Sequence, residues 1–192
     1  MAGNADLLEL FKESGALLEG HFLLTSGLHS SHYLQCALFL QFPANAERVG
    51  RELAEMLAPF SPTAVVSPAV GGILVGHEVA RALGLRAVFT ERESGVMTLR
   101  RGFSLKKGEK VVVVEDVVTT GGSIADAAQA VERAGAEGMA YGAIIDRSGG
   151  QVTLNRPLRT LTTVNFSTFK PAECPLCRQG TPAVKPGSRG LK

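Results

Sequence analysis

The sequence predicts an α/β fold, a parallel sheet flanked by helices. Short runs of β-branched residues alternate with helical segments that end at glycine, which is the pattern of a parallel sheet covered on both faces. Residues 111–114 are all valine, as expected of a central strand. With 192 residues, 45% of them apolar and 20% charged, the chain can bury one sizeable core and is too short for two ordinary domains. We therefore expect a single domain.

The first two expected elements are helices. In residues 4–15, Asp6 is the expected N-cap because Glu9 follows three residues later, and Gly15 is the expected stop. The segment 42–60 offers Pro43 as a first helical residue. Apolar residues recur after it at helical spacing and predict a buried stripe of Val49, Leu53, Met56 and Leu57.

From residue 63 onward the pattern alternates between strand and helix. The expected strands span residues 63–67, 85–89, 111–114 and 139–145, and the expected helices span residues 71–84 and 123–135. Gly84 is the expected end of the first of these helices, and Ser123 is the expected N-cap of the second. The last twenty residues are rich in Pro, Gly and Lys, a composition that predicts a poorly ordered tail.

Charge and composition favour small-molecule partners. Lys and Arg number 20 against 18 Asp and Glu, so no basic field predicts nucleic-acid binding. No long apolar run predicts a membrane span, and the N-terminus carries acidic residues rather than a leader pattern, so we expect a cytoplasmic protein. Cys36, Cys174 and Cys177 are too few for a disulfide framework and are expected to be reduced thiols.

Two acids, Glu115 and Asp116, stand directly before a turn rich in threonine and glycine. Ligands of open α/β sheets bind beyond the carboxyl ends of the strands, where this turn is expected to lie. The amides of residues 119–123 and the positive end of the following helix would converge on one point, which favours a phosphate. The turn lacks the lysine of a P-loop and the glycine spacing of a dinucleotide fingerprint. Another kind of phosphate ligand is therefore expected.

Carboxylates beside an anion site repel the anion unless they face sugar hydroxyls, a cation or developing positive charge. A ribose 5-phosphate meets all three conditions, because its phosphate fits the amides, its hydroxyls fit Glu115 and Asp116, and its C1 becomes cationic as a leaving group departs. One unit charge at about 4 Å contributes roughly 4 kcal/mol at an effective dielectric of about 20. The acids could therefore stabilise an oxocarbenium-like transition state.

The stretch VVVVEDVVTTGGS, residues 111–123, resembles the phosphoribosyl-diphosphate motif of the type I phosphoribosyltransferases. The resemblance implies the fold of that family, with a small hood formed by the N-terminal segment. It divides the expected domain into a hood over about residues 1–42, a core over residues 43–150, and a C-terminal strand and tail over residues 151–192. An ordinary strand, turn and helix with a surface acid pair is the alternative.

Three further stretches resemble the orotate phosphoribosyltransferases of that family. FLLTSGLHSSHYLQCALFL carries Tyr33, which matches an aromatic residue that closes over the base, with a core strand position as the alternative. SPAVGGILVG places Gly71 and Gly72 where the family's diphosphate loop lets amides approach an anion, although a tight glycine turn has the same sequence. IIDRSGG carries Arg147, which matches an arginine that meets the orotate carboxylate; a surface arginine is the alternative.

The resemblance implies transfer of ribose 5-phosphate from phosphoribosyl diphosphate to orotate, giving orotidine 5′-phosphate and diphosphate in de novo UMP synthesis. It implies Mg²⁺, contacted by Asp116 through water, a loop over residues 91–108 that closes over the diphosphate, and a homodimer with shared active sites. The implied catalytic residues are Glu115, Asp116 and Arg92. The implied contacts to phosphoribosyl diphosphate are Arg92, Glu115, Asp116, Val117, Val118, Thr119, Thr120, Gly121, Gly122, Ser123, Gly71 and Gly72, and those to orotate are Thr119, Arg147 and Tyr33.

The chain departs from the family pattern at positions on the phosphate side. Thr25 and Gly71 stand where these enzymes commonly have lysines, and the loop after Arg92, the matching arginine, has no histidine. Arginine stays protonated, so it can neutralise a departing diphosphate but cannot readily deliver a proton. The remaining loop cations are candidates by charge alone, with solvated surface charge as the alternative: Arg100, Arg101, Lys106 and Lys107.

Two other functions stay open on the sequence. A purine phosphoribosyltransferase would keep the ribose-phosphate turn, although Arg147 argues against it because purines lack a carboxylate. A regulator that binds phosphoribosyl diphosphate without turnover fits the missing lysines, although the chain shows no added nucleic-acid-binding segment.

The histidines and cysteines predict no metal centre within one chain. His21, His29, His32 and His77 lack metal-binding spacing and are expected to be hydrogen-bonded structural or surface residues. The cysteine pair of CPLC resembles half of a zinc knuckle whose second pair is missing from the chain. A metal shared between two subunits is the alternative.

Overall fold

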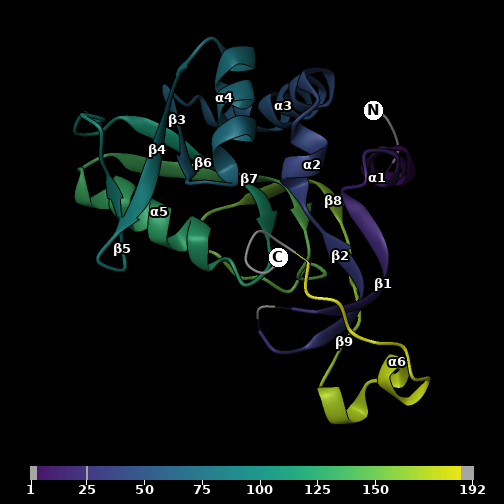
Figure 1. The fold of residues 1–192 in the computed structure, drawn as a ribbon. Helices are drawn as coiled ribbons and strands as arrows, with labels where there is room; N and C mark the ends of the chain where they lie inside the picture. The colour runs from purple at the N-terminus through teal and green to yellow at the C-terminus, as the bar shows by residue number, and fades with distance from the viewer. Residues whose placement is uncertain (1–3, 25, 187–192) are drawn as a thin grey trace. The chain divides into compact units, whose positions relative to one another are not determined.

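The computed structural model describes residues 4–24 and 26–186 (Figure 1), so the departure at Thr25 lies outside the described residues. The chain forms two compact units, one of Met1–Phe39 with Asn165–Lys192 and one of Leu40–Val164. We call these the smaller unit and the larger unit. The division into hood, core and C-terminal tail stays a prediction.

The larger unit contains a six-stranded sheet with the order β5-β4-β3-β6-β7-β8. All neighbouring strands run parallel except β5, which is antiparallel to β4. This confirms the predicted α/β class and the central position of the valine strand. The strands are β3 (Ala64–Pro68), β4 (Arg86–Glu93), β5 (Val96–Leu99), β6 (Lys110–Val118), β7 (Glu137–Asp146) and β8 (Leu158–Thr163).

Helices cover both faces of this sheet, with α3 and α4 on one side and α5 on the other (Figure 1). The valines of β6 are buried on both faces, since Val111 and Val113 pack in one core with Ile124 of α5, while Val114 approaches Gly142 beside Leu57 of α3. The helices are α3 (Pro43–Leu57), a 3-10 turn η1 (Ala58–Phe60), α4 (Gly72–Leu83) and α5 (Gly122–Arg133). No helix among the described residues is long and apolar enough to cross a membrane.

The helix ends follow the sequence signals in most cases. Pro43 is the first residue of α3, and α4 ends at Gly84, which has the left-handed conformation. Three residues of the predicted α3 stripe are fully buried, whereas Met56 is only partly buried. The strand β6 runs to Val118, four residues beyond the predicted end, so Glu115 and Asp116 lie within the strand.

The segment expected to be a mobile loop begins as a regular hairpin. Residues 91–93 belong to β4 and pair with β5, with Glu91 opposite Thr98 and Glu93 opposite Val96. Two ion pairs brace the hairpin, between Arg101 and Glu91 and between Arg100 and Glu93. The first part of the predicted 91–108 loop is therefore ordered by cross-strand pairing, which the polar composition did not reveal.

The smaller unit is built around a three-stranded sheet with the order β1-β2-β9. Its helix α1 begins at Asn4, so Asp6 lies in the first turn and is not the predicted N-cap. Buried Phe11 of α1 stacks on Phe39, with ring centroids 4.1 Å apart. The elements are α1 (Asn4–Glu13), β1 (Leu17–Leu23), β2 (His29–Leu34), α2 (Cys36–Leu40), β9 (Thr168–Phe169), η2 (Pro171–Glu173) and α6 (Pro175–Arg178), and the chain passes between units within α2.

The C-terminal segment through residue 186 is ordered, contrary to the prediction for this part of the tail, and residues 187–192 lie outside the described residues. After α6, the amide of Val184 donates to the carbonyl of His21, and the amide of Leu23 donates to the carbonyl of Val184, both at 2.8 Å. This segment therefore lies along β1. The composition of this segment predicts low burial, but it cannot predict that the backbone pairs with a strand that is distant in the sequence.

Candidate functional site

The carboxyl end of β6 leads through a short turn into α5 and forms the centre of the candidate site. A small pocket lies over this junction, lined by Glu115, Val117, Val118, Thr119, Thr120, Gly121, Gly122, Ser123 and Ile124. Because α5 begins at Gly122, its free amides and the positive end of its dipole face the same point. The turn predicted to hold an anion is therefore concave and lies where sheets of this class bind ligands.

Gly121, not Ser123, occupies the N-cap position of α5. It has φ +79°, and no side chain caps the helix, which makes the N-cap prediction for Ser123 wrong. A Cβ on Gly121 would lie 2.8 Å from Val152 Cγ2 and 3.0 Å from Leu154 Cδ2. The turn needs glycine here both for its left-handed backbone and for its packing against the segment after β7. The helix amides remain available to a ligand because no side chain uses them.

The two acids lie side by side at the end of β6 with different exposure. Glu115 is buried, 7% exposed, whereas Asp116 is half-buried. The amide of Asp116 donates to Glu115 Oε1 at 3.1 Å, and the amide of Val117 donates to Asp116 Oδ1 at 2.8 Å. Each carboxyl group is thus held by the amide of the following residue, and Glu115 lines the pocket.

Burial, followed by the negative charge of Asp116, raises the pKa of Glu115 to about 9. An ionised carboxylate loses hydration in the interior and is repelled by a neighbouring carboxylate, and both effects favour the protonated form. At neutral pH, Glu115 is therefore protonated in the free protein. The pair then carries one negative charge rather than two, which reduces its repulsion of a phosphorylated ligand.

The glycine loop before α4 packs directly against this acid pair. A Cβ on Gly71 would lie 2.8 and 2.9 Å from the two carboxylate oxygens of Asp116, and a Cβ on Gly72 would lie 3.0 Å from Glu115 Oε1. Only residues without a side chain fit between α4 and the acids. The structure thus brings together the two segments that the sequence assigned to diphosphate and ribose. The amino ends of α4 and α5 both meet this edge of the sheet.

Arg147 follows β7 and is linked to the same edge. Its backbone amide donates to the carbonyl of Val118 at 2.8 Å, which places Arg147 next to the turn after β6. The carboxylate of buried Asp146 accepts hydrogen bonds from the amides of Ser148 and Gly150 and so closes the loop that carries Arg147. Tyr33 is half-buried on β2 in the smaller unit, where its ring lies 5.8 Å from that of Phe22; its role at a base stays a prediction.

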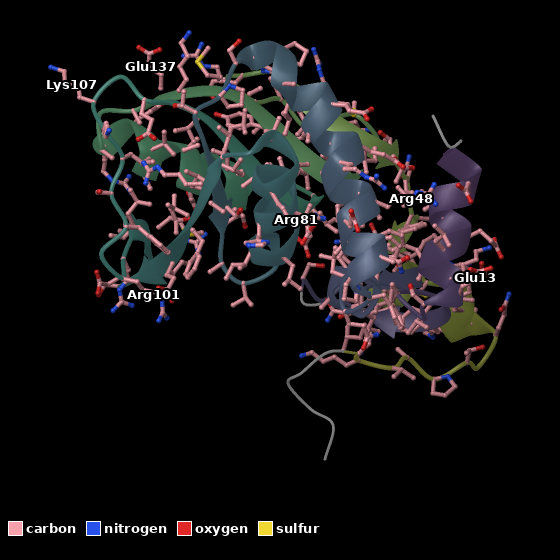
Figure 2. The ribbon with its side chains drawn as sticks, turned by 90° about the horizontal axis from the view of Figure 1, so that it is seen from above. Glu13, Arg48, Arg81, Arg101, Lys107 and Glu137 are labelled. Atoms are coloured by element: carbon pink, nitrogen blue, oxygen red, sulfur yellow. The ribbon has the colours of Figure 1, made fainter. Side chains whose placement is uncertain are left out.

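The loop arginines are engaged with acids of their own unit. Arg92 on β4 donates to the carbonyl of Gly95 and pairs with Asp126 of α5. Arg101 pairs with Glu91 beyond the end of β5 and lies at the surface (Figure 2). Arg92 is therefore held by the helix that follows the turn after β6.

Two residues that support the site were missed in the sequence. Asp126 holds Arg92, and Asp146 shapes the loop of Arg147. Asp146 had a local signal, because an aspartate followed by Ser and Gly commonly accepts hydrogen bonds from amides two to four residues later. Asp126 had none, since its pairing joins α5 to a strand 34 residues earlier.

Sequence comparison with known proteins identifies the family of this chain. A model of the phosphoribosyl transferase domain matches residues 40–173. The orotate phosphoribosyltransferase of Caldicellulosiruptor saccharolyticus is 52% identical over 185 residues, which cover 96% of this chain and 97% of that protein. The orotate phosphoribosyltransferase of Thermotoga maritima is 52% identical over 184 residues, which cover 96% and 98%.

Solved structures share the fold. The crystal structure of orotate phosphoribosyltransferase from Aeropyrum pernix has a TM-score of 0.67 and 26% identity, with 82% of this chain and 93% of that chain covered. The Mycobacterium tuberculosis H37Rv enzyme in complex with 5-phospho-alpha-D-ribosyl 1-diphosphate has a TM-score of 0.66 and 22% identity, with 83% and 95% covered. The second likeness concerns the fold alone.

Substitution of Gly71 by alanine is expected to displace Asp116 without unfolding the chain. The backbone at Gly71 is right-handed helical and accepts alanine, but the new Cβ would stand within 3.0 Å of the Asp116 carboxylate, which must move. We expect the stability to change by less than about 1 kcal/mol and the affinity for Mg²⁺ and phosphoribosyl diphosphate to fall about tenfold. Thermal unfolding and isothermal calorimetry measure the two effects.

The matched control is Gly138→Ala, since no atom lies within 4 Å of a Cβ built on Gly138. It should leave both stability and affinity close to those of the unsubstituted protein. Unchanged affinity in Gly71→Ala would contradict the placement of the Asp116 carboxylate in the binding site.

Proposed function

The chain belongs to the phosphoribosyl transferase family, and from this premise we propose how its residues carry out the reaction of an orotate phosphoribosyltransferase. The reaction transfers the ribose 5-phosphate group of phosphoribosyl diphosphate to orotate and yields orotidine 5′-phosphate and diphosphate, a step of de novo pyrimidine synthesis. The observation that carries the assignment of roles is the contact of two glycines with a carboxyl pair beside an anion turn.

The turn after β6 binds the 5-phosphate in this proposal. Thr119 and Thr120 are exposed, and the amides from Thr119 to Ser123 surround the pocket at the start of α5. Amides and hydroxyls of this kind donate hydrogen bonds to phosphate oxygens, and the helix dipole adds favourable charge. The phosphate thereby fixes the ribose with its hydroxyls toward the end of β6.

The acid pair binds the ribose hydroxyls. Asp116 accepts from a hydroxyl, while Glu115, protonated in the free protein, can also donate to a hydroxyl oxygen. As C1 becomes positive, negative charge on the pair stabilises the transition state. This effect is strengthened because Glu115 is largely shielded from water. The bond from C1 to the diphosphate oxygen breaks, a bond from C1 to N1 of orotate forms, and the proton that N1 carried is released to the departing diphosphate or to water.

The donor set fits Mg²⁺. Carboxyl oxygens are the hard ligands that Mg²⁺ prefers, and a cation resolves the repulsion between the acid pair and a diphosphate. Asp116, the half-buried member, would hold the ion through water, with Glu115 beside it on the ribose. When bound, Mg²⁺ neutralises the diphosphate and improves it as a leaving group.

The departing diphosphate meets the start of α4 in this proposal. The absence of side chains at Gly71 and Gly72 lets backbone amides approach its oxygens beside the acid pair. Arg92 then adds a permanent positive charge after releasing Asp126. Arg100 and Arg101 already pair with glutamates and have no role in this proposal. Lys106 and Lys107 have none either.

Orotate recognition falls to Arg147, Thr119 and Tyr33. Arg147 is joined to the end of β6 through its amide, and a guanidinium can hold the orotate carboxylate with two parallel hydrogen bonds. Thr119, at the first position of the turn, would contact the base from the ribose side. Tyr33 would cover the base, as the resemblance implies.

A homodimer and a cytoplasmic location complete the proposal. The family resemblance implies that the segment around residues 91–108 reaches the neighbouring subunit's site. Closure of this segment would exclude water, which would otherwise attack the cationic C1 and hydrolyse the substrate. Light scattering on the purified protein tests the dimer independently of catalysis.

The assignment is tested by following the ultraviolet absorbance of orotate in the presence of phosphoribosyl diphosphate and Mg²⁺. We expect orotate to disappear with release of diphosphate only when Mg²⁺ is present. Asp116→Asn is expected to lower kcat/KM at least about tenfold because it removes negative charge from the transition state. Glu115→Gln is expected to lower it by a similar factor because an amide, unlike the carboxyl group, cannot ionise as C1 becomes positive.

Glu137→Gln is the matched control, since Glu137 is exposed at the opposite end of β7 (Figure 2) and its substitution should leave kcat/KM unchanged. Turnover of a purine base in place of orotate would contradict the role of Arg147. Tight binding of phosphoribosyl diphosphate with no turnover of any base would instead indicate a regulator.

Arg92→Ala is expected to lower kcat/KM for phosphoribosyl diphosphate about tenfold or more, because it removes a positive charge from the departing diphosphate. Thermal stability should change little, since an exposed ion pair contributes little. Arg81→Ala is the matched control, because Arg81 is exposed to 49%, close to the 50% of Arg92, and pairs with Glu47 and Glu78 (Figure 2). Equal activity of the two variants would remove Arg92 from the mechanism.

A further inference from the structure

Four metal-ligating side chains from distant parts of the sequence meet in the smaller unit. His21 lies on β1 and His29 begins β2, while Cys174 directly precedes α6 and Cys177 lies within it. Their ligand atoms all lie within 4.8 Å of one another. His21, His29 and Cys174 are buried, and Cys177 is exposed. The reaction proposed above uses none of these residues.

The spacing of the ligand atoms is close to that of a tetrahedral zinc centre. Zn–S bonds of about 2.3 Å and Zn–N bonds of about 2.0–2.1 Å place neighbouring ligand atoms about 3.3–3.8 Å apart in a tetrahedron. Cys174 Sγ lies 3.4 Å from His21 Nε2, and Cys177 Sγ lies 3.8 Å from His21 Nε2 and 3.3 Å from His29 Nδ1. The two nitrogens are 2.7 Å apart and need to separate by about 0.6 Å to share one ion.

A hydrogen bond outside the cluster prepares His21 as a ligand. His21 Nδ1 lies 2.7 Å from the carbonyl oxygen of Thr181. A carbonyl can only accept, so Nδ1 carries the proton and Nε2 turns a free electron pair toward the cluster. Metal-ligating histidines commonly donate from their second nitrogen to a carbonyl in this way, which fixes both tautomer and ring orientation.

The β1–β2 hairpin explains why local spacing did not predict this histidine pair. Seven residues separate His21 from His29, which is not a metal-binding spacing. Antiparallel pairing of Phe22 with Ser30 and of Leu23 with His29 makes the two histidines diagonal neighbours, with ring centroids 4.7 Å apart. The chain has no second cysteine pair, but the strand register brings two histidines of β1 and β2 beside the cysteines of CPLC.

We propose that His21, His29, Cys174 and Cys177 form a structural zinc site. Two thiolates and two imidazoles in tetrahedral arrangement suit Zn²⁺, a borderline-soft cation, and do not suit Mg²⁺, which prefers oxygen ligands. The ligands use all four positions, so the site leaves none open for chemistry. Its effect is to fasten the C-terminal segment to the β1–β2 hairpin across about 150 residues of chain.

The alternative is a hydrogen-bonded histidine pair beside two thiols, without metal. In that arrangement His29 Nδ1 would donate to His21 Nε2. It accounts for the contact between the nitrogens but gives no reason for both thiols to lie within 4 Å of the same nitrogen. The two arrangements differ in metal content, in thiol reactivity and in stability after chelation.

The test uses the full-length chain, produced without a metal-binding tag in medium that contains Zn²⁺. Metal analysis after gel filtration should give about one zinc per chain. Replacement by Co²⁺ should produce the visible absorption of tetrahedral Co²⁺ and a thiolate charge-transfer band. Cys177→Ser and His29→Gln should each lose most of the zinc, whereas Cys36→Ala, which removes a buried thiol outside the cluster, should retain it.

Chelation should loosen the smaller unit. A nitrogen-donor chelator that removes Zn²⁺ but spares Mg²⁺ should lower Tm by at least about 5 °C, and the exposed thiol of Cys177 should react with iodoacetamide only after chelation. Because Cys177 is exposed, its serine variant should fold even if variants of the buried ligands do not. The readouts do not involve catalysis, so they stand or fall separately from the proposed function.

Three results would overturn the proposal. The first is a chain without zinc that also fails to bind added Zn²⁺ and unfolds at the same temperature with and without chelator. The second is a zinc content that Cys177→Ser and His29→Gln leave unchanged, since the ion would then lie elsewhere. The third is another metal in the same amount, lost from the same variants, which would refute the assignment of zinc.

Discussion

The close contact between an acid pair and a glycine loop is the constraint on which the larger unit's candidate site depends. Glu115 and Asp116 end the central strand, and the first residues of α4 pass so near that any side chain at Gly71 or Gly72 would meet a carboxyl oxygen. The contact excludes water from Glu115, fixes Asp116 and positions the amino end of α4 beside the anion turn.

Local signals in the sequence predicted the part of this arrangement that lies within short segments. The valine run, the turn after it and the stop at Gly84 all have the structure expected from neighbouring residues. The predicted N-cap at Ser123 was wrong because Gly121, two residues earlier, adopts a left-handed backbone and occupies the N-cap position. The β4–β5 hairpin was missed because cross-strand pairs and ion pairs, not apolar periodicity, order that segment.

Local sequence patterns could not predict the contacts between segments that lie far apart in the sequence. The approach of Gly71 to Asp116 joins residues 45 positions apart, and the ring pair of His21 and His29 depends on strand register. The smaller unit is formed from both ends of the chain around a three-stranded sheet. Small units bury too little apolar surface to be stable without further links, which gives a physical reason for a four-ligand cluster between its first hairpin and its last helix.

The pH dependence of stability tests the central constraint most directly. Burial raises the pKa of Glu115 from 4.5 to about 9, so between these values the folded protein holds a proton that the unfolded chain releases. The free energy of unfolding should therefore fall as pH rises through this window and level off above it. Removal of the ionisable group in Glu115→Gln should abolish that loss, whereas Glu137→Gln, at an exposed position, should preserve it.

The measurement is urea unfolding of the unsubstituted protein and both variants at about pH 5.5 and about pH 8. The account predicts that Glu115→Gln gains about 1–3 kcal/mol relative to the unsubstituted protein between the lower and the higher pH. The same pH dependence in all three proteins would show that Glu115 ionises normally. The buried acid pair would then not be the constraint around which the site is built.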